Sequence, residues 1–153
     1  MGIFPLFKKK EFFSPADNEK VVQAIRNAEM RTSGEIRVFI ESQCRFIDAM
    51  DRALEIFTNL KMEQTEYRNA VLLYIALKDR QLAVYGDKGI HEKVRAEFWN
   101  IAVKKTLAHF NKDDYAGGIA NCVTEIGESL QQHFPYDKGT DKNELPDEII
   151  FGK

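Results

Sequence analysis

The sequence predicts an α/β fold, a three-layer α/β/α sandwich built around a small mixed sheet. Three observations predict it: helical and strand-like segments alternate along the chain, one very short turn joins two of the strand-like segments, and each helical segment carries an apolar stripe. A helix must bury such a stripe against another element, and a sheet with helices on both faces accommodates all of them. The 153 residues are enough for one domain with a sizeable core.

The first half of the chain is predicted to form a helix, a strand and a second helix. Ser14 can cap the first helix and Pro15 suits its first position, and the helix should end near residues 32–34, where Thr, Ser and Gly favour a turn. Residues 35–42 alternate between apolar and polar side chains, which indicates a strand. Residues 46–60 are predicted to be helical, because one stripe holds Ala49, Ala53, Ile56, Phe57 and Leu60.

The second half is predicted to form two strands and two helices. Residues 69–77 are a continuous apolar run, which suits a central strand covered on both faces. Residues 78–80 then turn the chain so tightly that the next strand, residues 81–86, must run antiparallel beside it. A long helix is predicted over residues 88–110. A further helix carries apolar residues at helical spacing from Ile119 to Phe134, before Pro135 ends it.

The predicted domain organisation has three parts. Residues 1–13 are a leader segment, residues 14–136 are the α/β/α domain, and residues 137–153 are a C-terminal extension. The leader has apolar residues before its lysines, which is the reverse of a signal peptide, so we expect a loose segment or one packed on the domain. The extension is polar and broken by Gly and Pro. Its last apolar residues, 149–151, can add an edge strand or pack on the domain.

Composition and charge exclude several classes of partner and site. The formal net charge of −2 argues against nucleic acid as the main partner, because a phosphate backbone attracts a clearly basic face. No apolar run is long enough to span a membrane. Cys44 and Cys122 have no metal-ligand spacing, and we expect both to be mostly buried thiols in a reducing, cytoplasmic compartment, although a bridge between them stays open.

The predicted topology brings three polar stretches, distant in sequence, to one rim of the sheet. Glu35 starts the first strand, Arg68 lies just before the second, and Asp87 ends the third, which runs back beside the second. Carboxylates are hard oxygen ligands that suit Ca²⁺ or Mg²⁺, so Glu35 and Asp87 are candidate metal ligands. Arg68 can hold a phosphate through paired hydrogen bonds. Two simpler roles stay open: Asp87 as a helix cap, and Arg68 as the salt-bridge partner of Glu35 or Asp87.

The opposite rim is the second candidate for a cation site. It should carry Glu41 at the end of the first strand, Asp79 in the hairpin turn, and Asp113 with Asp114 before the last helix. Open α/β sheets usually bind ligands beyond the carboxyl ends of their parallel strands, which favours this rim. The simpler roles here are a solvated turn for Asp79 and a helix cap for Asp113 or Asp114.

Several stretches of the sequence resemble the TPM-domain family, which includes thylakoid-lumen proteins linked to photosystem II repair and many bacterial proteins. They are "SGEIRVFIE", "ALEIFTNLKMEQTEYRNAVLLYIALKDRQLAVYGDKGI", "FNKDDYAGGI" and "HFP", and together they extend over roughly residues 14–136. The resemblance implies an α/β/α sandwich, divalent-cation binding in some members and an acid phosphatase activity proposed for plant members. By position it points to Glu35, Arg68, Gly86 and Asp87. Since the chain shows no signal peptide or membrane anchor, it looks like a free-standing bacterial form.

We therefore expect a non-catalytic module that binds Ca²⁺ or Mg²⁺ through surface carboxylates and supports a partner protein or assembly. The alternative is a metal-assisted acid phosphatase, in which the cation polarises the phosphoryl oxygens and Arg68 stabilises the developing charge. A phosphatase needs an activated nucleophile, and no Ser, Cys or His stands in a recognisable triad or motif. That absence favours the binding module.

Overall fold

The computed structural model describes residues 13–136 and 148–152, and its elements follow the predicted order. In chain order they are α2 (Pro15–Glu29), β1 (Glu35–Glu41), α3 (Ala49–Asn59), β2 (Ala70–Ala76), β3 (Gln81–Gly86), α4 (Lys88–Phe110), α5 (Tyr115–His133) and β4 (Ile150–Phe151). Each predicted strand therefore agrees with an observed strand to within about a residue at either end.

The strands form one mixed sheet in the order β3-β2-β1-β4. β1 and β2 run parallel, with Glu35 opposite Ala70, and β3 runs antiparallel to β2. The short strand β4 lies parallel to β1 at the other edge. These pairings confirm the chain reversal predicted at residues 78–80. Of the two roles left open for residues 149–151, the structure shows the edge strand.

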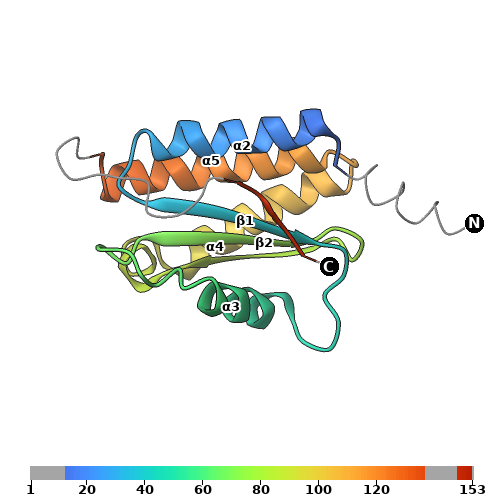
Figure 1. Cartoon of the computed structure of the whole chain (residues 1–153), viewed down its shortest axis with the longest axis horizontal. Helices are drawn as coiled ribbons and strands as arrows, with labels where there is room; N and C mark the ends of the chain where they lie inside the picture. Colours follow the sequence, from blue (N-terminus) through green and yellow to red (C-terminus); the bar gives the residue numbers. More distant parts are fainter. Residues whose placement is uncertain (1–12, 137–147, 153) are drawn as a thin grey trace, which may run out of the picture.

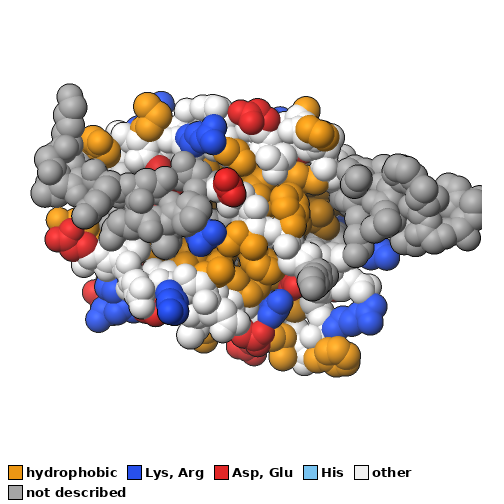
Figure 2. Space-filling model, viewed as in Figure 1, with side chains coloured by type: hydrophobic (Ala, Val, Ile, Leu, Met, Phe, Trp, Pro, Cys, Tyr) orange, Lys and Arg blue, Asp and Glu red, His pale blue; other side chains and the backbone are white. Residues whose placement is uncertain are grey.

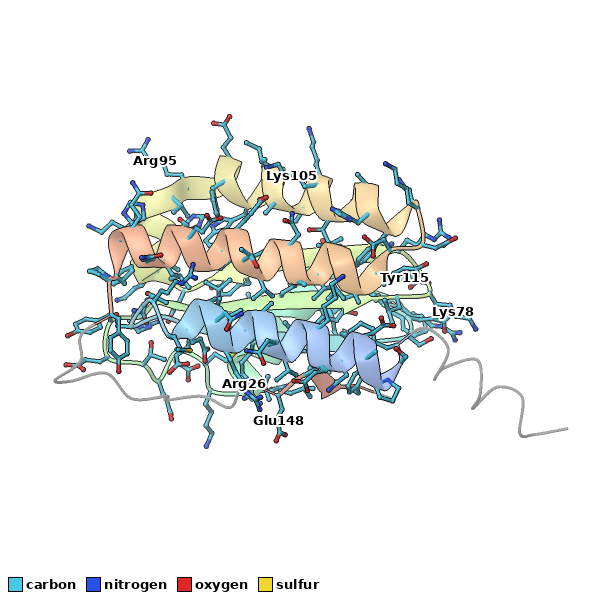
Figure 3. All side chains as sticks on the ribbon, turned by 90° about the horizontal axis from the view of Figure 1, so that it is seen from above. Arg26, Lys78, Arg95, Lys105, Tyr115 and Glu148 are labelled. Carbon is cyan, nitrogen blue, oxygen red and sulfur yellow. The ribbon has the colours of Figure 1, made fainter. Side chains whose placement is uncertain are left out.

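Helices cover both faces of the sheet and complete the three layers (Figure 1). On one face α2, α4 and α5 pack on a core that includes Ile36, Val38 and Leu73, and Figure 3 shows these three helices side by side. On the other face α3 packs on Leu72 and Tyr74. β2 is buried along its whole length, as predicted for a central strand. The predicted α/β sandwich is confirmed.

The helix after β1 begins later than the sequence predicts. The Asp48 side chain accepts a hydrogen bond from the Asp51 amide at 2.8 Å, so Asp48 caps α3 and the helix starts at Ala49. Phe46 stays in the preceding loop, with a φ of 75° and a side chain that is 99% exposed. The helical prediction for residues 46–48 is wrong because an Asp side chain competes for backbone amides and favours the cap position over the helix interior.

Helix α4 has the predicted bounds, but its backbone is kinked. Arg95 has φ 66° and ψ 172°, a conformation that interrupts the helical geometry between Lys88 and Phe110. Figure 3 shows the Arg95 side chain projecting outward near one end of α4. Arginine is a good helix former, so nothing in the local sequence predicts this break.

The surface mixes charged groups of both signs with exposed apolar groups. Lys and Arg side chains are interspersed with Asp and Glu in the space-filling view, and apolar side chains surface in the middle of that face (Figure 2). Phe151 of β4 is 54% exposed, and its ring lies 6.0 Å from the ring of Phe13. Within the described residues, no helix is both long and apolar enough to cross a bilayer.

Candidate functional site

The structure places Glu35 and Asp87 on the same rim of the sheet. Glu35 lies opposite Ala70 at the start of β1, and the Asp87 amide donates to the Ala70 carbonyl oxygen at 2.9 Å from the other side. Ala70 therefore separates the two residues, whose backbones are two strand spacings, about 10 Å, apart. We call this edge, where β1 and β2 begin, the amino rim.

Asp87 has two structural roles at the amino rim. It caps α4 by accepting the Lys88 amide hydrogen on Oδ1 at 2.8 Å. It also accepts two hydrogen bonds from the Arg68 guanidinium, from Nε to Oδ2 at 2.6 Å and from Nη2 to Oδ1 at 2.9 Å. The bond to Asp87 raises the pKa of Arg68 above its usual value. Both simpler roles that the sequence left open are thus present, and a cation bound by Asp87 would have to displace Arg68.

The backbone around Arg68 is held against the start of α4. Arg68 has a φ of 53°, and its carbonyl oxygen accepts the Gly89 amide hydrogen at 2.8 Å. A side chain at Gly89 would collide with the carbonyl oxygens of Tyr67 and Arg68. Glycine at position 89 therefore lets the helix start close to the loop that carries Arg68, which sets the geometry of the Arg68–Asp87 pair.

Glu35 belongs to a group of carboxylates around one arginine. It is 2% exposed, and Arg37, two residues along the same face of β1, lies near Glu148, Glu29 and Glu35. Burial lowers the pKa of Arg37, and these three carboxylates oppose that effect. Glu29, near the end of α2, also accepts the Ile36 amide hydrogen at 2.8 Å. Sequence reasoning missed Glu29 and Glu148 because only the fold brings the end of α2 and the C-terminal extension to this rim.

Two neutral oxygen atoms lie buried in the loop that leads into β2. Asn69 is fully buried; its side-chain nitrogen lies 3.3 Å from the Ser33 hydroxyl oxygen, and its Oδ1 accepts no hydrogen bond within the described part of the chain. The Thr65 hydroxyl, in the same loop, likewise has no partner among those residues. Buried polar atoms are nearly always bonded to protein, water or an ion, so these two oxygens can accept a hydrogen bond from water or bind an ion.

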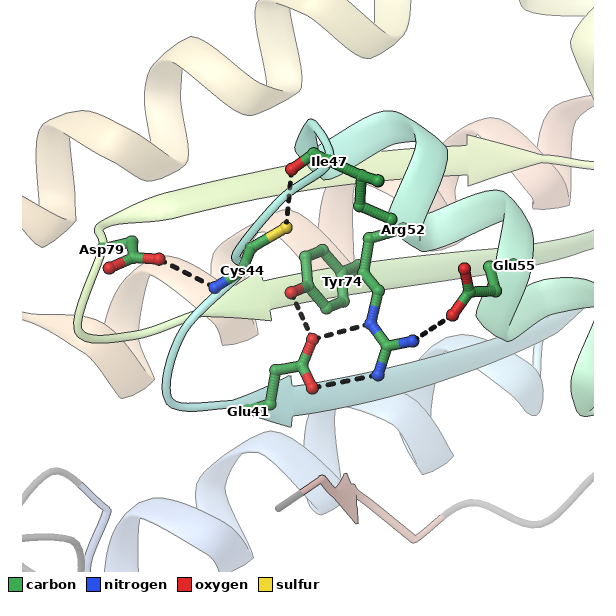
Figure 4. Close-up of polar contacts among 7 residues, drawn as sticks. All are labelled: Glu41, Cys44, Ile47, Arg52, Glu55, Tyr74 and Asp79. Atoms are coloured by element: carbon green, nitrogen blue, oxygen red, sulfur yellow. Dashed lines mark hydrogen bonds and ion pairs between the residues drawn. The ribbon is translucent and has the colours of Figure 1, made fainter.

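At the opposite rim, Glu41 is part of a closed polar network (Figure 4). Its carboxylate accepts hydrogen bonds from Arg52 Nε at 2.9 Å, from Arg52 Nη2 at 3.1 Å and from the Tyr74 hydroxyl. Arg52 also donates to Glu55. Burial, followed by the bond to Glu41, raises the pKa of Tyr74, and the bond to Glu41 raises the pKa of Arg52. Glu41 is thus paired with a cation and with a hydroxyl donor.

The remaining carboxylates of the opposite rim also have partners. Asp79 accepts the Cys44 amide hydrogen at 2.7 Å, and Asp113 pairs with Arg80 at 3.1 Å. Asp114 caps α5, and the bond with His109 lowers its pKa. In residues 13–136 and 148–152 no three Asp, Glu, His or Cys side chains are grouped so that they could hold a metal ion.

The two cysteines are unbridged. Cys122 is buried, as expected, and burial raises its pKa to about 11. Cys44 is only partly buried, and its thiol donates to the Ile47 carbonyl oxygen at 3.3 Å (Figure 4).

Comparisons with known proteins agree on the fold. A protein-family model described as TPM domain matches residues 6–129. The NMR structure of the BA42 protein from the psychrophilic bacterium Bizionia argentinensis is 38% identical, with 92% of this chain and 96% of that chain covered and a TM-score of 0.84. The N-terminal domain of the cg2496 protein from Corynebacterium glutamicum is 16% identical, with 77% and 74% covered and a TM-score of 0.62. A search of curated proteins finds no match to the chain.

Proposed function

Because the chain belongs to the TPM domain family, we propose that it is a non-catalytic module that binds Ca²⁺ or Mg²⁺ through carboxylates at the amino rim and presents the bound form to a protein partner. The observation that carries this proposal is the convergence of carboxylates at the start of β1. Glu29, Glu35 and Glu148 all lie near the Arg37 guanidinium. Carboxylate oxygens are the ligands that Ca²⁺ and Mg²⁺ prefer in proteins.

The donor set at the amino rim supports a hard cation. Ca²⁺ takes six to eight oxygen ligands from carboxylates, amide carbonyls, backbone carbonyls and water. The three carboxylates are not grouped into a ready-made metal site within the described residues, so the proposal requires their side chains to turn toward the ion. The loop before β2 offers two further buried oxygens, those of Asn69 and Thr65. At the opposite rim, by contrast, Glu41 already has an arginine and a tyrosine as donors. The amino rim is therefore the better of the two candidate sites.

In this proposal Asp87 has a different role from Glu35, because its oxygens are already occupied. Its two oxygens accept three hydrogen bonds, two of them from Arg68. A cation can use Asp87 only when Arg68 moves aside, and Arg68 is then free to hold an anion that accompanies the cation. We assign Glu35 to the primary ligand set and Asp87 with Arg68 to this second, displaced state.

The test is calorimetric titration of the full chain with CaCl₂ and with MgCl₂. Glu35→Gln keeps the size of the side chain and removes its charge, so we expect affinity to fall at least about tenfold, a loss of about 1.4 kcal/mol. Asp113→Asn is the matched control, because Asp113 is a carboxylate of the opposite rim with a 75% exposed side chain. Equal affinity in Glu35→Gln and Asp113→Asn would remove Glu35 from the site.

The metal-assisted phosphatase gains no specific support from the described residues. Arg68, its expected phosphate ligand, is engaged by Asp87. The Cys122 thiol stays protonated at neutral pH because burial raises its pKa to about 11. A generic aryl phosphate assayed with and without Mg²⁺ should therefore show no turnover above the buffer rate. The two unbridged thiols support our proposal that the protein works in a reducing compartment such as the cytoplasm.

A further inference from the structure

A pocket of about 390 Å³ lies at the edge strand β3, between α3 and the kinked helix α4. Its lining includes Met50 of α3, Tyr85 of β3, Trp99 of α4 and the Arg68–Asp87 pair. The volume falls in the range of small-molecule sites, which are mostly apolar with a few placed polar groups. We propose that this pocket binds a small organic anion with a flat apolar part, independently of the cation proposed above.

The apolar wall of the pocket is a fixed indole. Trp99 is 5% exposed, and its Nε1–H donates to His91 Nδ1 at 3.0 Å. A side chain at Gly86 would collide with the ring of Trp99, so glycine at the end of β3 makes room for the indole. The ring is thus fixed against β3 at Gly86 and at its edge by His91, and its small accessible part gives the pocket a rigid apolar wall.

The bond from Trp99 also determines what His91 can offer a ligand. Because Nδ1 accepts a hydrogen, the neutral imidazole carries its own proton on Nε2. His91 therefore presents a hydrogen-bond donor. Asn100 and Lys88, which also line the pocket, add amide and ammonium donors.

The charges that line the pocket favour an anion. Asp87 is the only carboxylate among the lining residues, and its oxygens accept hydrogen bonds from the Arg68 guanidinium and from the Lys88 amide. The charges of Arg68 and Asp87 cancel, which leaves Lys88 as the remaining charged residue in the lining. A ligand with a carboxylate or a phosphate would match this charge and the donors beside it.

The kink in α4 is a second, independent feature of the same place. Arg95 divides α4 into two parts, and the pocket is lined by Lys88 and His91 from the first part and by Ala96, Trp99 and Asn100 from the second. A non-glycine residue in so rare a backbone conformation persists only where its surroundings hold it, and such residues cluster at ligand clamps. The kink lets the two parts of α4 line one cavity.

Trp99 makes this pocket directly observable, because the chain has one tryptophan. The full chain, kept in EDTA so that no divalent cation contributes, is titrated with phenyl phosphate, with benzoate and with benzyl alcohol, an uncharged molecule with the same ring. We expect saturable shifts of the single indole N–H resonance and quenching of tryptophan fluorescence with at least one anion, but not with benzyl alcohol. Comparison of the two anions tells a phosphate site from a carboxylate site.

Four variants make the result decisive. Lys88→Glu should weaken anion binding at least about tenfold, whereas Lys88→Arg should retain it. Lys93→Glu is the matched control, because Lys93 is exposed on the same part of α4 but does not line the pocket. Glu35→Gln should bind the probes as the unmodified chain does, so failure of the cation proposal leaves this one standing. The proposal is overturned by absence of any indole shift up to about 10 mM probe, by equal shifts with benzyl alcohol, or by equal binding in Lys88→Glu and Lys93→Glu.

Discussion

At the scale of single residues, the amino rim is organised by Asp87. Its carboxylate caps α4 and pairs with Arg68, while it is itself 2% exposed. Losing a helix cap costs about 0.5–2 kcal/mol. The pairing of Asp87 with Arg68 stabilises the same start of α4 in addition to the cap. These roles explain why an acidic residue follows directly after a strand and before a helix.

Substitution of Asp87 should therefore destabilise the fold, by an amount that depends on the replacing side chain. Asp87→Asn keeps a capping oxygen but loses the charge, and Asp87→Ala loses both, so we expect Ala to cost about 1 kcal/mol more than Asn in urea unfolding. Asp113→Asn serves as the control and should stay within about 0.5 kcal/mol of wild type, since its side chain is 75% exposed and Asn tolerates the left-handed backbone at this position. If Asp87→Ala were as stable as Asp113→Asn, the cap would contribute nothing.

Asp114 gives a prediction for pH. The bond with His109, followed by the bond from the Gly117 amide, lowers the pKa of Asp114 in the folded chain. A lowered pKa means that folding favours the carboxylate, so its contribution is present above the unfolded-state pKa of about 3.9 and is lost as the pH falls through the folded value. The stability difference between wild type and Asp114→Asn should shrink on acidification. A difference that grows toward acid pH would contradict this assignment.

At the scale of elements, hydrophobic periodicity predicted the strands and the topology well. The apolar run of β2 and the three-residue turn before β3 are local signals, and together they place Glu35, Arg68 and Asp87 on one rim. Two features had no local signal. The carboxylates Glu29 and Glu148 reach the rim only through tertiary packing, and the kink at Arg95 arises in a sequence of ordinary helix formers.

The backbone strain at the kink can be tested by measuring the stability of glycine variants. Arg95 occupies a region of φ and ψ that is almost confined to glycine and costs about 1–3 kcal/mol for other residues. Arg95→Gly should therefore stabilise the chain by about 1 kcal/mol after the entropy cost of glycine is subtracted. Lys104→Gly, at an exposed regular position of α4, should destabilise it by about 1 kcal/mol. Destabilisation by both variants would show that Arg95 is held in an unstrained geometry.

At the scale of the whole molecule, the two faces of the sheet are covered differently. On one face, three helices pack on an extensive apolar core, and on the other face α3 packs alone. The polar chemistry collects at the rims, where turns, caps and strand ends expose oxygen atoms. Glu29, Glu35 and Glu148 come together near Arg37 at the amino rim, and this convergence of carboxylates underlies the cation-binding proposal.

Cation binding should raise the stability of the whole fold. A ligand present at a hundred times its dissociation constant adds about 2.7 kcal/mol to the free energy of unfolding. We expect CaCl₂ or MgCl₂ to raise the melting temperature of wild type and of Asp113→Asn, with a much smaller rise for Glu35→Gln. The same rise in all three proteins would reflect a general salt effect instead of a site.

The most direct test is a titration of the ¹⁵N-labelled full chain with Ca²⁺, followed through its backbone amide resonances. Saturable shifts should gather at Glu29, at residues 35–37 and at Glu148, and residues 41, 79 and 113 should stay unchanged. Shifts confined to those last three positions, or no saturable shift at any amide, would contradict a cation site at the start of β1.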